Sequence, residues 1–168
     1  MAQFQITDDL KMFLCGNFIE YSFKQDDNGN DLKADRALFE TINRPEEIFF
    51  LAQSCNWDDG AVIPCWIVDS PLCTKAAALT IFWQSAPYEY MEHDFGSKIV
   101  GWCGGVDEEQ TEILNLLERL VKRFERNDFH PLSIKFDFSV WGGKLLVKDP
   151  KWSVPNEFFC DASGIEII

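Results

Sequence analysis

Cys103 is the residue whose type and setting most readily suggest covalent chemistry. It lies in the stretch Gly101-Trp102-Cys103-Gly104-Gly105, just before the strongest helical pattern of the chain. A thiol near a helix N-terminus has a lowered pKa, and a thiolate paired with a histidine base is the nucleophile of thiol hydrolases. His93 or His130 would be that base. The glycines also have an ordinary turn explanation, and no family motif surrounds the cysteine, so a thiol hydrolase is only the alternative hypothesis.

Two other clusters contain residue types that bind metals. Residues 88–94 place His93 among carboxylates, but a metal site there would need further ligands from elsewhere in the chain. Residues 26–30 resemble the start of a calcium loop, yet the twelfth position is Ala37, where calcium loops carry a glutamate. The six cysteines form no Cys-x-x-Cys pair, and motifs for phosphate loops, dinucleotides and serine hydrolases are absent. We therefore predict no metal and no cofactor.

Negative charge is the dominant property of the chain. Asp and Glu total 28 against 15 Lys and Arg, which gives a formal net charge of -13. Such a field repels nucleic acids and anionic membranes and attracts cationic surfaces. Acidic residues are concentrated in residues 26–59, and we predict that the acidic residues of this segment bind the partner. They are Asp26, Asp27, Asp31, Asp35, Glu40, Glu46, Glu47, Asp58 and Asp59.

Length and hydropathy predict a single domain over residues 1–168. The N-terminus has no basic region followed by an apolar run, and no stretch reaches 18 apolar residues. We expect a cytoplasmic protein with reduced cysteines. The sequence does not define an oligomeric state.

Helical periodicity predicts a helical core over about residues 31–127. The expected helices cover residues 31–42, 45–55, 75–86 and 107–127. A further helix runs through Val62 to Ile67, starts as late as about Ile63 because Pro64 suits a first turn, and is closed by Ser70-Pro71. Pro45 suits the first turn of the second helix. The expected N-terminal caps are Asp31, either Asp58 or Asp59, Thr74 and Asp107. Residues 88–106 are expected to be irregular.

Alternating apolar residues predict a small antiparallel sheet from the terminal segments. One strand is expected over residues 18–23. Residues 132–138 alternate in the same way, and Gly142-Gly143 would turn them into residues 144–148, which predicts a C-terminal hairpin over about residues 132–148. The predicted fold class is α+β, mainly helical with this small sheet.

Residues 45–87 carry an Asn56-Trp57-Asp58-Asp59-Gly60 turn, then Cys73, then Ala78-Leu79 and Phe82-Trp83. This order resembles a bacterial domain-of-unknown-function family with an Asn-Trp-Asp-Asp-Gly turn and an Ala-Leu-x-x-Phe-Trp helix. Thr74 stands where the family tends to have an aspartate after the cysteine, and the frequent preceding histidine is absent. The resemblance implies an immunity protein, the role suggested for some members that lie beside secreted toxins. From the residues alone, Trp57 is expected to be a core anchor between two helices.

These observations favour binding over catalysis. We expect a non-catalytic domain, a bacterial immunity protein that neutralises its cognate secreted toxin by binding it through an acidic surface. The toxin would be basic if charge steers the encounter. The alternatives are the Cys103 thiol hydrolase and an adaptor subunit of a housekeeping complex.

Overall fold

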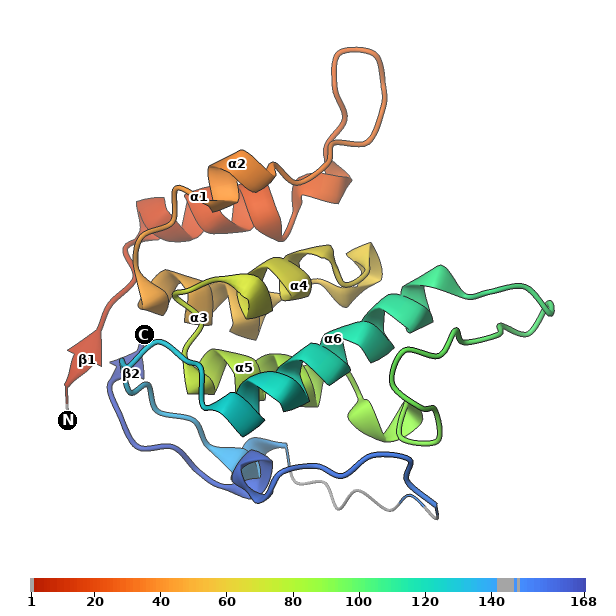
Figure 1. Cartoon of the computed structure of the whole chain (residues 1–168). Helices are drawn as coiled ribbons and strands as arrows, with labels where there is room; N and C mark the ends of the chain where they lie inside the picture. The colour runs from red at the N-terminus through yellow and green to blue at the C-terminus, as the bar shows by residue number, and fades with distance from the viewer. Residues whose placement is uncertain (1, 142–146, 148) are drawn as a thin grey trace.

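The computed structural model describes residues 2–141, 147 and 149–168 (Figure 1). Two short strands, β1 (Gln3–Phe4) and β2 (Glu166–Ile167), lie near the chain ends. The α-helices are α1 (Asp8–Phe18), α2 (Arg36–Phe39), α3 (Pro45–Ser54), α4 (Val62–Asp69), α5 (Lys75–Gln84) and α6 (Glu108–Arg126). Short 3₁₀ helices cover Tyr21–Phe23, Trp57–Asp59, Pro87–Glu89, Phe138–Val140 and Asn156–Phe159. The prediction of a mainly helical fold is confirmed.

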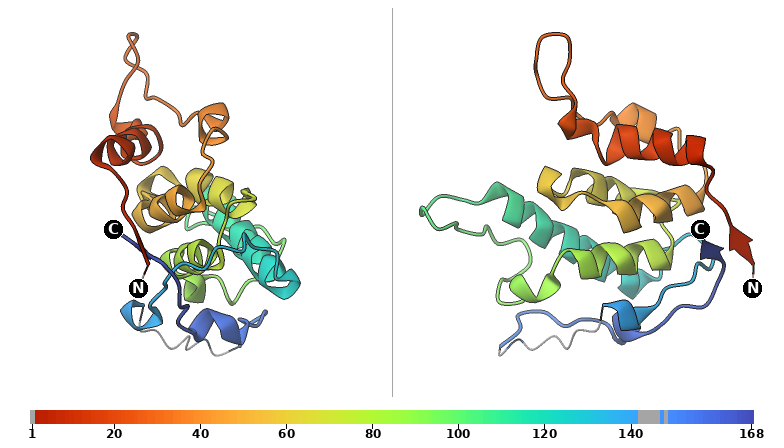
Figure 2. Two further views of the ribbon diagram at one scale, coloured as in Figure 1. Left: turned by 90° about the vertical axis from the view of Figure 1, so that its left-hand side faces the viewer. Right: turned by 180° about the vertical axis from the view of Figure 1, so that it is seen from behind.

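The helices are stacked in layers (Figures 1 and 2). The first layer is α1 with α2, the second is α3 with α4, and the third is α5, with α6 slanting across α4 and α5. The C-terminal segment covers the remaining side of α5. Every residue of α5 from Ala76 to Trp83 is buried. A helix that is apolar all round needs such a central position.

Local signals explain the helices of the core. The Thr74 hydroxyl accepts the Ala77 N–H at 3.2 Å, and the Asp107 carboxylate accepts the Gln110 N–H at 3.0 Å, so both predicted caps are confirmed. Pro45 occupies the first turn of α3, as predicted. These caps, together with the apolar periodicity, place α3, α4, α5 and α6 within a few residues of their predicted bounds.

The predicted strand over residues 18–23 is wrong. The segment contains the end of α1 and the 3₁₀ turn Tyr21–Phe23. Thr7 caps α1 by accepting the Leu10 N–H, and Leu14 and Phe18, four residues apart, are its buried positions. Helical spacing therefore prevails over the short alternation that suggested a strand.

The helix predicted over residues 31–42 is also much shorter than expected. Asp31 does not cap it, because Asp31 pairs with Gln25 across an exposed loop. Asp35 provides the cap, accepting the N–H groups of Ala37 and Leu38 at 2.8 and 3.2 Å. Only Arg36–Phe39 is helical.

The prediction of an antiparallel sheet is wrong, because β1 and β2 pair in parallel, with Gln3 opposite Glu166 and Phe4 opposite Ile167. The strands come from opposite ends of the chain and are joined by the helical core rather than by a hairpin turn. Ile134 and Phe136, from the alternating segment 132–138, pair with Ile165 and Ala162 instead. Residues 142–146 and 148, which include the expected turn and most of its partner strand, lie outside the described residues.

The C-terminal segment completes the core. Phe158 is fully buried between Phe82 and Phe124, with ring centroids 4.1 and 4.0 Å away. The Trp83 indole N–H donates to the Phe158 carbonyl at 2.9 Å. One hydrophobic cluster thus extends from Leu14 in α1 to Phe158. Among the residues that the structure describes, no helix is both long and apolar enough to cross a bilayer.

Candidate functional site

The Asn56–Gly60 turn is held by its own side chains. The Asn56 side chain accepts the Asp58 N–H at 3.2 Å and donates to the Asp59 carboxylate at 3.0 Å. Gly60 has φ +75°, a conformation that favours glycine. The prediction that Asp58 or Asp59 caps the following helix is wrong, since Ala61 occupies that position and no side chain caps α4 there. Asp58 is exposed and Asp59 is partly exposed.

Trp57 ties this turn to the helical core but is only half-buried. Its indole N–H donates to the Gln84 side chain at 3.2 Å, and the Gln84 amide donates to the Gln53 carbonyl at 3.1 Å. The expected anchor between helices is thus a polar bridge from the turn to the ends of α3 and α5. It fixes the position of the two neighbouring aspartates.

An open groove of about 690 Å³ lies between this turn and the first turns of α6. We call it the acidic groove. The described residues of its walls include five carboxylates and no Lys or Arg, together with Gly60, Thr111 and Asn115. The carboxylates are Asp58, Asp59, Glu108, Glu109 and Glu112. None of the ion pairs found in the described part of the chain involves any of these five.

Helix electrostatics explain only part of this cluster. Glu108 and Glu109 lie in the first turn of α6, where the helix dipole favours negative charge. That effect falls off beyond the first turn, so it does not account for Glu112 or for the two aspartates across the groove. Like charges at such a site repel one another, and a cationic partner would relieve that repulsion.

The other predicted binding residues lie elsewhere and have separate local roles. Asp26 accepts the Asn30 side-chain amide at 3.0 Å and the backbone N–H groups of Asn30 and Asn28 within the exposed loop, and these hydrogen bonds lower its pKa. Asp35 caps α2, and Glu40 pairs with Arg36 at 2.9 Å. Glu47 in the first turn of α3 is partly desolvated, which raises its pKa. Asp27, Asp31 and Glu46 complete this set.

The structure therefore brings only Asp58 and Asp59, of the nine predicted binding residues, into the acidic groove. Sequence reasoning missed Glu108, Glu109 and Glu112. The available signal was their density, since three glutamates lie within five residues of a well-capped helix start.

Cys103 and the two histidines are not assembled into a catalytic group. Cys103 is exposed on the loop that precedes α6. His130 follows the other end of this 19-residue helix, which is about 28 Å long at 1.5 Å per residue. The His130 backbone N–H donates to the Cys73 carbonyl at 2.9 Å, and its ring Nδ1 accepts the Leu132 N–H. In residues 2–141, no hydrogen bond joins Cys103 to His93 or His130.

The reactivity of each thiol should follow its exposure to solvent. Cys103 and Cys160 are exposed, whereas burial raises the pKa of Cys65 to about 11 and of Cys73 to about 12. We expect iodoacetamide at neutral pH to label Cys103 and Cys160 within the time needed for free cysteine, and Cys65 and Cys73 only after unfolding. Mass spectrometry of timed digests measures each rate. A Cys103 rate well above that of free cysteine would contradict this and support the thiol hydrolase.

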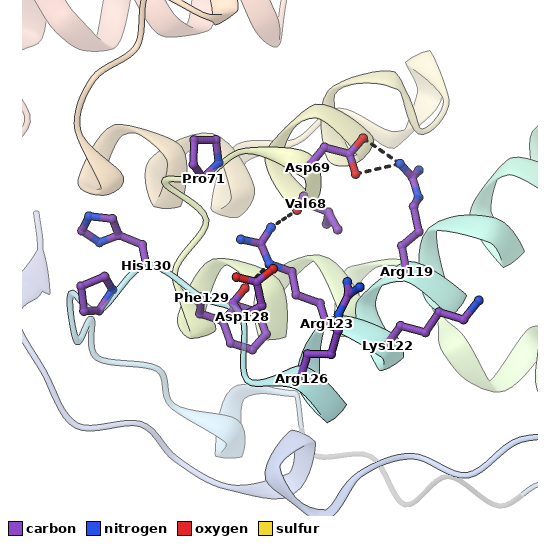
Figure 3. Close-up of a pocket in the computed structure, with 11 residues that line it drawn as sticks. Val68, Asp69, Pro71, Arg119, Lys122, Arg123, Arg126, Asp128, Phe129 and His130 are labelled. Carbon is purple, nitrogen blue, oxygen red and sulfur yellow. Dashed lines mark hydrogen bonds and ion pairs between the residues drawn. The ribbon is translucent and has the colours of Figure 1, made fainter.

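A second hollow, of about 530 Å³, lies between α4 and the C-terminal half of α6 and is basic (Figure 3). Its cations are largely engaged with the protein itself. Arg119 makes two bonds to the Asp69 carboxylate, at 2.9 and 2.8 Å, and Lys122 pairs with Glu118 at 2.5 Å. Arg123 is buried and donates to the carbonyls of Val68, Ser70 and Asp128. Arg123 therefore clamps the end of α4 to the segment after α6, and the role of this hollow is mainly structural.

Metal ligands are not gathered in either hollow. In the residues with a described structure, no group of three or more His, Cys, Asp or Glu side chains has a geometry that would hold a metal ion. The five carboxylates of the acidic groove are thus arranged along a surface rather than around one point.

Comparison with known proteins gives a match to a protein family. No curated protein and no solved structure matches the chain. Residues 43–125 match the model of a family described as a domain of unknown function, DUF4274. The matched segment contains α3 to α6 and therefore both walls of the acidic groove. This match is consistent with the resemblance to a domain-of-unknown-function family.

Proposed function

We propose that this chain is a non-catalytic protein-binding domain that acts in the cytoplasm as a bacterial immunity protein. It binds a basic, cognate secreted toxin through the acidic groove and blocks the toxin's active surface. The observation that carries the proposal is the groove itself, in which five carboxylates line an open hollow and none of them forms an ion pair with a described Lys or Arg.

The chemistry of the groove favours Lys and Arg side chains of a protein partner. Arginine forms paired hydrogen bonds with carboxylates, and lysine supplies a compact positive charge. An open volume of about 690 Å³ accommodates several such side chains at once. Several contacts at fixed spacing would give specificity that a single ion pair lacks.

The field of the whole chain supports the same partner. A net charge of -13 accelerates the encounter with a basic protein and repels nucleic acids and other acidic proteins. A toxin that acts on nucleic acid carries the basic surface that such a field attracts. Occupying that surface would block access of its substrate.

Coexpression tests this role. The product of the adjacent gene, expressed alone in a bacterial host, should arrest growth, and coexpression of the full chain should restore it. The matched negative control is a chain with the five groove carboxylates converted to amides, which should not restore growth. If the adjacent product is harmless, or if growth arrest persists with both proteins present, the immunity role is wrong.

A further inference from the structure

Trp102 is the exposed member of the six tryptophans. Trp83 and Trp152 are buried, and Trp57, Trp66 and Trp141 are partly buried, whereas Trp102 is fully exposed. Val100 and Val106, which pair directly with each other nearby, are also exposed. Tryptophan is enriched among the residues that dominate binding energy at protein interfaces. Because it is fully exposed, the Trp102 side chain does not contribute to the packing of the domain.

The loop that presents Trp102 is tied firmly to the domain; we call residues 99–107 the Trp102 hairpin. Its base is fixed because Ile99 is buried, its N–H donates to the Thr111 hydroxyl at 3.0 Å, and its carbonyl accepts the Asp107 N–H at 2.8 Å. Near the tip, the Gly101 N–H donates to the Gly105 carbonyl at 2.9 Å. The backbone of the hairpin is therefore held in place before binding, so that less of it has to be ordered when a partner docks.

The Trp102 hairpin adjoins the acidic groove. It leads directly into α6, and Asp107, at its base, caps the helix whose next residues form one wall of the groove. Figures 1 and 2 show this loop extending past the N-terminal end of α6, away from the stacked helices. An apolar projection and an acidic hollow thus lie at the same end of the molecule.

We propose that the Trp102 hairpin and the acidic groove form one docking surface, in which Trp102 enters an apolar pocket of a basic protein. Lys and Arg around that pocket engage the five groove carboxylates. The inference rests on the proposed binding function and specifies its anchor and the shape of its partner.

Charge complementarity selects a basic protein over other occupants of this surface. A second copy of the chain would bring another net charge of -13 and another acidic groove, so the two surfaces would repel each other. An anionic membrane would be repelled for the same reason. A basic protein with an apolar pocket can bind both the Trp102 side chain and the carboxylates of the adjoining groove.

The test places the photoreactive residue p-benzoylphenylalanine at position 102 of the full chain, in cells that also express its genomic neighbours. Position 23 is the matched control, because Phe23 is also aromatic and 77 % exposed but lies at the end of the molecule that carries α1. We expect a crosslink from position 102 to a basic protein and none from position 23. Conversion of the five groove carboxylates to amides should abolish the crosslink.

Three results would overturn the inference: no crosslink from position 102, an equal crosslink from position 23, or a crosslink only to a second copy of the chain. If the basic protein captured is not the product of the adjacent gene, the docking surface stands and the immunity role fails. For a bound adjacent-gene product, we expect Trp102→Ala to weaken binding about 30-fold and Phe23→Ala less than about twofold. Equal effects of these substitutions would leave the immunity role intact and remove Trp102 as the anchor.

Discussion

Replacing Arg123 with alanine is expected to lower the free energy of unfolding by about 3–5 kcal/mol. Its guanidinium is buried, donates to three backbone carbonyls and lies over the Phe129 ring, 5.3 Å from the centroid. Two of these carbonyls, those of Val68 and Ser70, belong to the end of α4. In the alanine variant, these two carbonyls would stay buried but lose their hydrogen-bond donor. The contact of the guanidinium with the Phe129 ring would be lost as well.

Urea unfolding followed by circular dichroism measures this effect. Lys122→Ala is the matched control, because Lys122 is the neighbouring residue of α6 but is exposed and, within the described part of the chain, forms an ion pair with Glu118 alone. Its substitution should change the free energy of unfolding by less than about 1 kcal/mol. Equal effects of the two substitutions would show that Arg123 is not the clamp between α4 and the segment after α6.

Converting the five groove carboxylates to amides is expected to weaken binding of the adjacent-gene product about 100-fold at low salt. The substitutions are Asp58→Asn, Asp59→Asn, Glu108→Gln, Glu109→Gln and Glu112→Gln. Each removes a charge that would face a Lys or Arg of the partner, and together they remove the local field of the groove. Calorimetric titration of the purified proteins measures the dissociation constant.

A control variant separates the groove from net charge. Asp27→Asn, Asp31→Asn, Glu40→Gln, Glu46→Gln and Glu47→Gln also remove five negative charges, so either variant takes the net charge from -13 to -8. The control residues lie outside the groove, and we expect them to weaken binding less than about fivefold. Similar losses in both variants would mean that overall acidity, rather than the groove, governs binding.

The helical core was predictable because its signals are local. Thr74 and Asp107 cap their helices as predicted, and apolar residues at helical spacing define the elements between them. The errors arose where a short pattern suits two structures. Residues 18–23 alternate like a strand, but Phe18 also lies four residues after Leu14, and packing against the core decides for the helix.

The arrangement of the C-terminal segment depends on contacts that sequence periodicity does not report. Ile134 and Phe136 alternate as a strand would, yet their partners are Ile165 and Ala162. Gly164 permits this approach, because a Cβ there would lie 2.2 Å from the Ser133 carbonyl oxygen. These pairs join residues that are distant in the sequence, so no local pattern reports them.

The acidic groove was only half predictable for a similar reason. Charge density along the sequence pointed to residues 26–59 and thus to Asp58 and Asp59. The opposite wall comes from α6, some fifty residues later, and is brought near by the packing of α4 against α6. Charge density within one segment cannot reveal a cluster that two distant segments form together.

The central claim is that the acidic groove binds a basic toxin encoded beside this chain. Its most direct test is the association rate constant between the full chain and the purified adjacent-gene product, measured by stopped-flow fluorescence as ionic strength rises from about 0.01 M to about 1 M. The screening length falls from about 30 Å to about 3 Å over that range. We predict that the rate constant falls at least about tenfold while the dissociation rate changes much less. An absence of binding, or an association rate independent of salt, would contradict the account.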